Sequence, residues 1–388
     1  MSNKNTIRLL ALAASTFSGC AFAVDAMSIK LADGLEFTPG LAVSENYDDN
    51  FRELEKHAES SWITTISPSF ALGAQGRKLS YGLAYTANSD TFHSDQHYNN
   101  TDHHFVADSQ VRFDSRNRLD LEAAYHKVID TSSKTVGQEG DKYNTKNIGG
   151  SYTYGADTAT GQLVFGADYK ELRYDNDGDL NADKERDSTA LTSTFFYRIG
   201  PKTRALVELR STDFDYLTAT DLDATNLALL GGATWQATAL TSGTVKFGRE
   251  RKSFDSNAHD DASGGMWEVG IAWEPLSYST FGLKARRSLD EGEDGASAIR
   301  STSSTLDWTH DWASRISSTV SYTHIEQDYL DSAIGRLDKG DIFGVGLTYQ
   351  MRRWLDVKLG YRYAENDSTA AGESYERNIY SIMFTGSL

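Results

Sequence analysis

An aromatic residue recurs along most of this chain at intervals of 35 to 43 positions. Each of these residues ends a stretch of roughly ten residues in which apolar and polar side chains alternate, which is the period of a β-strand with one apolar face. A second such stretch and a long polar loop separate successive members, so the repeating unit is a β-hairpin. The series is Phe70, Phe113, Tyr154, Tyr197, Trp235, Trp273, Trp308, Tyr349 and Phe384.

The alternating segments follow one another from Leu35 to Leu388 without a linker. In water their apolar faces would need one very large core, whereas lipid surrounds such faces directly. A sheet in hydrocarbon must close, because unpaired backbone groups at an open edge cost several kcal/mol each. The pattern therefore predicts an all-β fold, a transmembrane antiparallel β-barrel of about 18 strands over residues 35–388, with aromatic rings where its wall meets the headgroups.

The predicted connections alternate between short and long. Outer-membrane barrels place short turns in the periplasm and long loops outside, so this alternation predicts that both chain ends are periplasmic. The short turns are expected at Gly73–Lys78, Asp114–Arg118, Ala156–Gly161, Gly200–Thr203, Gln236–Thr241, Glu274–Ser279, Asp311–Arg315 and Gln350–Trp354. Long loops are expected between them, as at Asp130–Tyr143, Tyr174–Asp187 and Asp255–Ser263. A second row of aromatic residues should mark the extracellular side of the lipid, at Tyr85, Tyr125, Tyr169, Phe247, Tyr322 and Tyr363.

The first residues have the composition of an export signal. Lys4 and Arg8 precede an apolar run, and Ala21-Phe22-Ala23 fits the cleavage site of a secretory signal peptide over residues 1–23. Residues 24–34 would then form a short periplasmic segment before the barrel. The one cysteine, Cys20, lies near the cleavage site in a context close to a lipoprotein box, which leaves lipidation as an alternative.

Composition narrows the possible functions. The net charge is −17 and no long basic run occurs, which argues against a nucleic-acid partner. The strand-borne histidines, His126, His310 and His324, come with no motif that names a Ser or Asp partner, so we expect no enzyme. We likewise expect no cofactor and no metal site, because the histidines near His97 lack a zinc spacing.

One segment carries a family resemblance. Leu35-Glu-Phe-Thr-Pro-Gly-Leu-Ala-Val-Ser-Glu-Asn-Tyr-Asp-Asp-Asn50-Phe51, followed by Ser67-Pro68 and Arg77, resembles the start of the second putative β-barrel porin family. This resemblance implies a channel in the outer membrane of a Gram-negative bacterium that takes part in exopolysaccharide or capsule export, with export components as partners. The motif residues are Tyr47, Asp48, Asp49 and Asn50. They also fit a turn-forming cluster at a strand end.

The last strand resembles the C-terminal signal that barrel-assembly machinery recognises, although it ends in Leu388 rather than Phe. The machinery is therefore an expected partner. The alternative function is a structural or adhesive barrel with a closed bore, which would act through its acidic extracellular loops.

Charged residues on the predicted inward face are balanced in sign, so the pore should not select ions strongly by charge. They include Arg112, Glu122, Asp168, Lys170, Glu208, Arg210, Lys246, Glu250, Glu268, Lys284, Arg286, Asp356, Lys358 and Arg362. Almost every strand aromatic is predicted to face lipid, with Phe196 as an inward exception, which argues against a sugar track of aromatic rings along the wall.

Four arginines fall on the lipid-facing side at the extracellular strand ends: Arg173, Arg249, Arg251 and Arg287. An arginine there costs about 0 to 1 kcal/mol, against about 2 to 4 at the bilayer midplane. We expect outer-membrane lipid and lipopolysaccharide to be partners and these arginines to contact the lipopolysaccharide phosphates. The alternative is that they only snorkel out of the bilayer.

Overall fold

The structure is a computed structural model that describes residues 28–132, 140–238 and 240–387. The predicted signal peptide with Cys20, and the final residue Leu388, lie outside the described residues. Among the described residues, no helix has both the length and the apolar character needed to cross a membrane.

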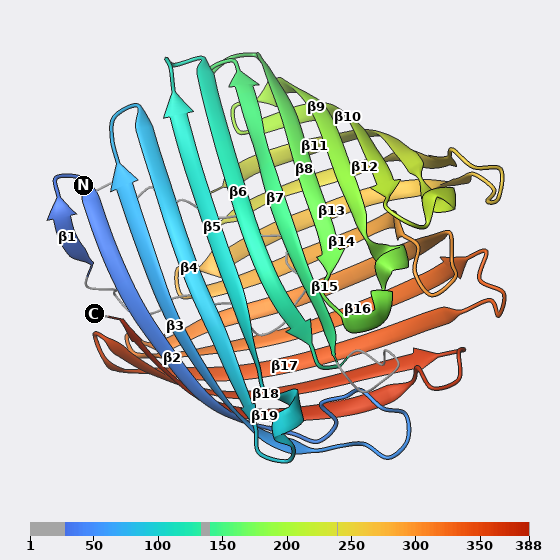
Figure 1. Cartoon of the computed structure of the whole chain (residues 1–388). Coiled ribbons are helices and arrows are strands. Elements are labelled where there is room, and N and C mark those ends of the chain that lie inside the picture. Colours follow the sequence, from blue (N-terminus) through green and yellow to red (C-terminus); the bar gives the residue numbers. More distant parts are fainter. Residues whose placement is uncertain (1–27, 133–139, 239, 388) are drawn as a thin grey trace.

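Eighteen antiparallel strands, β2 to β19, pair in chain order, and β19 pairs with β2 to close the sheet. The predicted fold and strand number are confirmed. In Figure 1 the strands of the near wall, such as β5 to β8, run at an angle to the strands of the far wall, such as β15 to β18. The strands are β2 (Leu35–Asp48), β3 (Ser61–Gln75), β4 (Leu79–Phe92), β5 (Asn100–Arg112), β6 (Asn117–Asp130), β7 (Asp141–Tyr154), β8 (Gly161–Tyr174), β9 (Arg186–Gly200), β10 (Thr203–Tyr216), β11 (Ala224–Thr238), β12 (Thr241–Phe254), β13 (Ala262–Leu276), β14 (Ser279–Glu291), β15 (Ala298–Ala313), β16 (Ile316–Leu330), β17 (Leu337–Arg352), β18 (Leu355–Ser368) and β19 (Tyr375–Ser387).

The remaining elements are short. A strand β1 (Ile29–Ala32) pairs with the start of β2, outside the predicted barrel segment. Four 3-10 helices lie in the connections: η1 (Gln96–Tyr98), η2 (Asp177–Asp179), η3 (Ala182–Lys184) and η4 (Thr220–Leu222).

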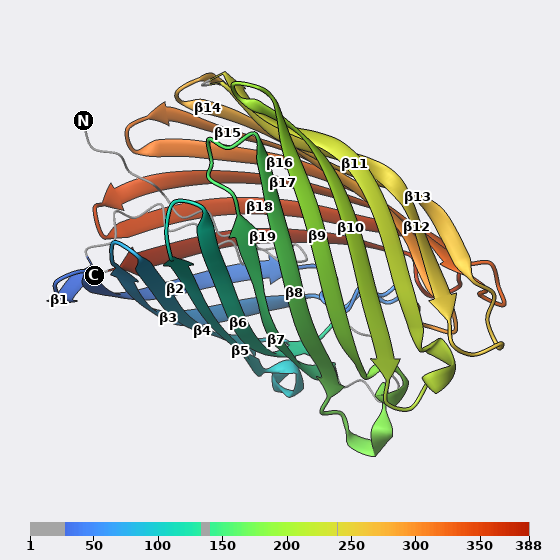
Figure 2. The ribbon, with the colours of Figure 1, turned by 90° about the horizontal axis from the view of Figure 1, so that it is seen from above.

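The two ends of the barrel differ in their connections. Eight connections of two to six residues join the strands at one end, and nine of six to twelve residues join them at the other. We call these the short-turn end and the long-loop end. Strand β1 and the C-terminus lie together at the short-turn end (Figures 1 and 2), as the alternation of turn lengths predicts.

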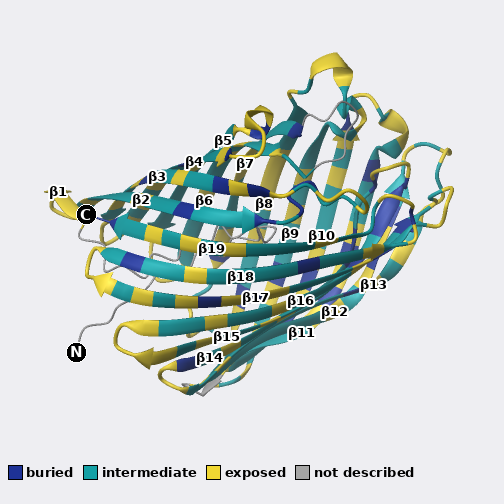
Figure 3. Cartoon of the chain, turned by 90° about the horizontal axis from the view of Figure 1, so that it is seen from below, coloured by how far each residue is buried: buried dark blue, intermediate teal, exposed yellow. Residues whose placement is uncertain are grey.

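The outer face of the wall is apolar and carries the aromatic series. Phe70, Phe113, Tyr154 and Tyr197 are each about half exposed, between 46% and 52%. Phe70 on β3 pairs directly with Tyr85 on β4, with ring centroids 6.5 Å apart. These two rings therefore lie at one height, and the prediction that Tyr85 belongs to a separate extracellular row is wrong at this position. Exposed and less exposed positions alternate along β17 (Figure 3), which is the period of a sheet with two unlike faces.

Contacts between strands that are not neighbours identify the inner face. Arg210 on β10 reaches Glu268 on β13 at 3.0 Å, and the Tyr216 hydroxyl on β10 donates to Glu291 on β14 at 2.7 Å. Adjacent strands lie roughly 4.8 Å apart along the wall, so side chains three or four strands apart meet only across the concave side. The face that carries Arg210 and Glu268 therefore lines the bore.

Candidate functional site: the bore

The predicted inward charges all lie on the face opposite the exposed apolar side chains. The structure brings four of them together near the middle of β10, β12 and β13. Arg210 contacts Glu208 at 2.6 Å and Glu268 at 3.0 Å, while the Lys246 ammonium lies 2.9 Å from Glu208 and 3.2 Å from Glu268. Two cations thus alternate with two carboxylates in a closed ring of ion pairs.

Burial explains why this ring must be complete. Glu208 is 4% exposed, and its carboxylate also accepts a hydrogen bond from Thr194 at 3.1 Å. A buried carboxylate without partners is costly, so each charge depends on the two beside it. The ring is neutral, which agrees with the balance of charges that the sequence predicts. It fixes these side chains against one sector of the wall.

The other predicted inward charges are dispersed over the wall. Glu250 accepts hydrogen bonds from Asn226 and from the Leu289 N–H, and Arg286 pairs with Asp290 at 3.1 Å. Arg112 bonds to Gln110, while Asp356 keeps one buried carboxylate oxygen without a partner in the described part of the chain. The charges Glu122, Asp168, Lys170, Lys284, Lys358 and Arg362 lie on the same inner face, outside the ring.

The long-loop end of β14 and β15 leaves the wall and enters the bore. Glu291 accepts hydrogen bonds from the Lys252 ammonium on β12 at 2.9 Å and from the Tyr216 hydroxyl at 2.7 Å. Lys252 is 1% exposed, and Ala298 on the returning strand is fully buried. Residues 288–300, which we call the β14–β15 tip, therefore pack against the inner wall of β10 to β12.

A cavity of about 450 Å³ lies between the β14–β15 tip and the opposite wall. From β8 and β9 come the cations Lys170 and Arg186, and from β10 the ring of Phe214. The tip contributes Asp290, Glu291 and Glu293, and β16 contributes Gln327. The tip thus narrows the bore to a site where an apolar ring, two cations and several hydrogen-bonding groups face one another.

This cavity corrects one sequence-based expectation. Phe214 and Tyr216 lie on the inner face, and Tyr329 is 5% exposed beneath the Arg336 guanidinium. Phe196 is therefore not a rare exception, and the expectation that the bore lacks aromatic rings is wrong at the long-loop end. These rings lie at the long-loop ends of their strands. There the alternation reverses, as in β10, where Asp213 and Asp215 take the outer positions and the rings of Phe214 and Tyr216 the inner ones.

The family motif joins the first and last strands of the barrel. Asp48, 1% exposed, forms an ion pair with Arg377 of β19 at 2.6 Å, and the Asp49 carboxylate accepts from the Asn378 N–H and side-chain amide. Asn50 donates to the carbonyl groups of Leu54 and Glu376. The motif does turn the chain, as one alternative proposed, and it also fastens the closing seam.

The four lipid-facing arginines differ in their partners. Arg173 is held by the Asp187 carboxylate and two backbone carbonyls, and Arg251 by Asp261 at 2.7 Å. Arg249 and Arg287 have no ion pair or hydrogen bond among the described residues, and the Arg287 Nε is buried. Among the described residues, only Arg249 and Arg287 of the four thus have guanidinium groups without a partner.

The histidines occupy separate places. His126 contacts His104, and His324 accepts or donates a 2.9 Å hydrogen bond with Asp341 on the outer face. No Ser, Thr or Cys side chain hydrogen-bonds to His324 in the described ranges, so the pair lacks a bonded nucleophile. Among the same residues, no group of three or more His, Cys, Asp or Glu side chains is placed to hold a metal.

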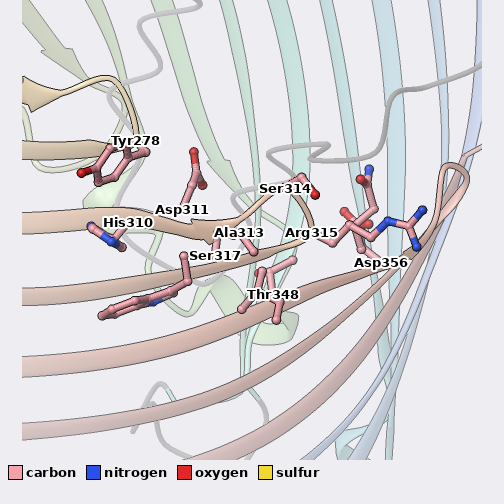
Figure 4. A pocket seen from close by; sticks show the side chains of 12 residues that line it. Tyr278, His310, Asp311, Ala313, Ser314, Arg315, Ser317, Thr348 and Asp356 are labelled. Carbon is pink, nitrogen blue, oxygen red and sulfur yellow. The ribbon is translucent and has the colours of Figure 1, made fainter.

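The short-turn end has a pocket of its own, around the turn between β15 and β16 (Figure 4). Tyr278, His310 and Asp311 line one side, and Asp356 and Thr348 belong to the strands beyond. His310 packs edge-on against the Tyr278 ring with centroids 5.4 Å apart. Its surroundings are aromatic and structural, and no charged partner binds it among the described residues.

Comparison with known proteins agrees with the fold. A family model described as Putative beta-barrel porin 2 matches residues 36–386. A search of curated proteins found no match. The solved structures of Acinetobacter baumannii OccAB4 and of Pseudomonas aeruginosa OccK2 (OpdF) in complex with glucuronate are each 12% identical, cover 91% of this chain and 98% of their own, and have TM-scores of 0.51.

The FrpB iron transporter of Neisseria meningitidis is 11% identical with a TM-score of 0.48, and the match covers 85% of this chain. This chain spans 62% of that protein, less than two thirds of its length. Likeness at such identities shows the fold alone, which is that of an outer-membrane barrel.

Proposed function

Because the chain belongs to the Putative beta-barrel porin 2 family, we propose that this porin-like outer-membrane channel passes carbohydrate and takes part in exopolysaccharide or capsule export. Barrels of 16 to 18 strands leave an aqueous channel inside the wall. The inner face of this one is polar, with its central charges neutralised in pairs. A neutral, hydrated wall suits a solute that carries many hydroxyl groups and few charges.

The observation that carries the proposal is the cavity beside the β14–β15 tip. Phe214 offers an apolar surface for a sugar ring, while Ser188, Gln327 and the tip carboxylates offer hydrogen bonds to hydroxyl groups. Lys170 and Arg186 add positive charge on the opposite wall, which would favour a sugar that carries a carboxylate. A barrel of this fold was solved in complex with glucuronate, a sugar acid, so the fold is compatible with such a ligand.

Block of single-channel current in planar bilayers tests this proposal. Oligosaccharides that contain uronic acid, added at the long-loop side, should interrupt the current of the wild-type protein. Lys170→Gln with Arg186→Gln should weaken this block at least tenfold, because hydrogen bonds to charged groups contribute about 1.5 to 3 kcal/mol each. Block by neutral oligosaccharides should change little, since no carboxylate is involved.

Lys127→Gln provides the matched control, because it removes a charge from the outer face near the same end. Equal block of wild type and double variant by the acidic sugar would contradict the proposed site. Failure of any sugar to block an open channel would contradict a carbohydrate cargo.

A second candidate is the closed barrel that acts through its extracellular loops. The packed β14–β15 tip favours it, because the tip fills part of the bore. Steady currents from the purified protein would exclude this candidate. Silence from correctly folded protein, followed by current after removal of residues 292–297, would support it.

A further inference from the structure

The wall is split between β13 and β14 at the long-loop end. Both strands are described in full, and their pairing ends at Trp267 with Arg287. β13 remains paired with β12 as far as Ala262, and β14 with β15 as far as Glu291. Residues 262–266 and 288–291 are therefore not paired with each other. The cause is the entry of the β14–β15 tip into the bore.

Two arginines flank the outer side of this split. Arg287 is at its base, and Arg249 on β12 pairs with Gly265 of the exposed β13 edge. A side chain at Gly265 would meet nothing within 4 Å, so open space lies beside Arg249 on the outer face. The strands β12 and β14 lie roughly 10 Å apart along the wall, a gap that two long side chains can close around a small group.

The split lies just beyond the lipid. Arg287 pairs with Trp267, which pairs with Phe247 of the predicted extracellular aromatic row, and Phe247 is 58% exposed. Aromatic rows mark the interface between hydrocarbon and headgroups, so in the predicted orientation the long side chains of the two arginines extend toward headgroup height. The exposed edge of β13 adds backbone N–H donors at the same height.

Unused donors indicate that a ligand belongs there. Arg173 and Arg251 lie on the same outer face near the same end, and carboxylates of this chain satisfy both. Arg249 and Arg287 have no such partner in the described part of the chain, and the Arg287 Nε is removed from water. An anion between the two arginines would accept hydrogen bonds from guanidinium N–H groups that no carboxylate of the described residues occupies.

We propose that Arg249 and Arg287 bind a phosphate group of lipopolysaccharide in the split between β13 and β14. Guanidinium groups match phosphate oxygens with paired, charge-assisted hydrogen bonds. The site is separate from the channel function, because it faces lipid. Of the four arginines predicted to contact lipopolysaccharide, the proposal assigns this contact to Arg249 and Arg287 and not to Arg173 and Arg251.

Native mass spectrometry of the full barrel in detergent tests this proposal. Wild type should retain added lipopolysaccharide, and Arg249→Gln with Arg287→Gln should lower retention at least tenfold. Arg173→Gln is the matched control and should retain it as wild type does. The folded state of each variant is checked by its resistance to unfolding in gel loading buffer without heating.

Two further arms identify the source of the phosphate. Dephosphorylated lipopolysaccharide should bind wild type and the double variant equally weakly, because the recognised group is gone. Millimolar inorganic phosphate should compete poorly, since the lipid anchors its own phosphate at the site. Unchanged retention by the folded double variant would overturn the proposal, and full displacement by inorganic phosphate would overturn the lipid assignment.

Discussion

Replacement of Lys252 by methionine should release the β14–β15 tip and enlarge the bore. The Lys252 ammonium is 2.9 Å from Glu291 and lies over the rings of Phe214 and Phe254 at 5.2 and 5.3 Å. Methionine is one atom shorter than lysine and still reaches the two rings, but among the described residues it leaves the Glu291 carboxylate with the Tyr216 hydroxyl as its hydrogen-bond partner. Only the charge compensation is lost.

The expected magnitude follows from burial. Removal of one partner from a buried ion pair costs about 3 to 5 kcal/mol, which corresponds to roughly two to three and a half decades in an equilibrium constant. Glu291 can avoid this cost by moving the tip into the aqueous bore. The hydrogen bond from the Leu289 N–H to Glu250 and the Arg336–Asp294 pair still hold the tip, so we expect partial release.

Single-channel recording measures the release directly. Lys252→Met should show larger or fluctuating conductance levels that are absent from wild type. The double variant Lys252→Met with Glu291→Gln should return toward the wild-type level, because no charge is then buried alone. Arg251→Gln is the control, since the neighbouring Arg251 is on the outer face with a side chain 68% exposed, and its pair contributes about 0.2 to 1 kcal/mol. Wild-type currents from Lys252→Met, or identical currents from the single and double variants, would refute this account of the tip.

Two other predictions concern charge and pH. Glu208→Gln with Glu268→Gln leaves the positive charges of Arg210 and Lys246 unneutralised. The reversal potential measured in a KCl gradient should therefore shift from near-zero selectivity in wild type toward anion selectivity. An unshifted potential would mean that ions do not pass this ring. Burial, and then the neighbouring Asp294 carboxylate, raises the pKa of Glu293 in the loop of the tip. At pH values above this raised pKa, the ionised Glu293 carboxylate destabilises the docked tip. As the pH falls through the raised pKa toward the ordinary glutamate pKa, Glu293 takes up a proton and the docked tip becomes more stable. In the Lys252→Met variant, whose tip is partly released, acidification should shorten the dwell times in the larger conductance levels. Addition of Glu293→Gln should abolish that pH dependence.

The sequence predicts the wall of the barrel well because lipid imposes a strict period. Each side chain of a strand faces either lipid or bore, so rings such as Phe70 and Tyr197 define the outer face of their whole strands. Turn lengths then place the strand ends. The strand number and the shared side of the chain ends follow from these two local signals.

The arrangement inside the bore could not be predicted in the same way. Alternation assigns Glu208 and Lys246 to the inner face, but their meeting depends on wall curvature and on side-chain length across β11. The tip is less predictable still, because β14 bends where its pairing with β13 stops, and no local residue pattern specifies that bend. The pairing of Arg173 with Asp187 across one long loop was likewise not predicted, because alternation assigns a face to Arg173 and no partner.

The seam between β2 and β19 has a consequence for the order of assembly. The partners of Asp48, Asp49 and Asn50 are synthesised 326 to 329 residues after them, as Arg377, Asn378 and Glu376. Strand β2 must therefore wait, with Asp48 lacking its ion-pair partner, until β19 has been delivered. A chain cut short before β19 lacks Arg377, the ion-pair partner of Asp48, so the motif completes its contacts only when the barrel closes.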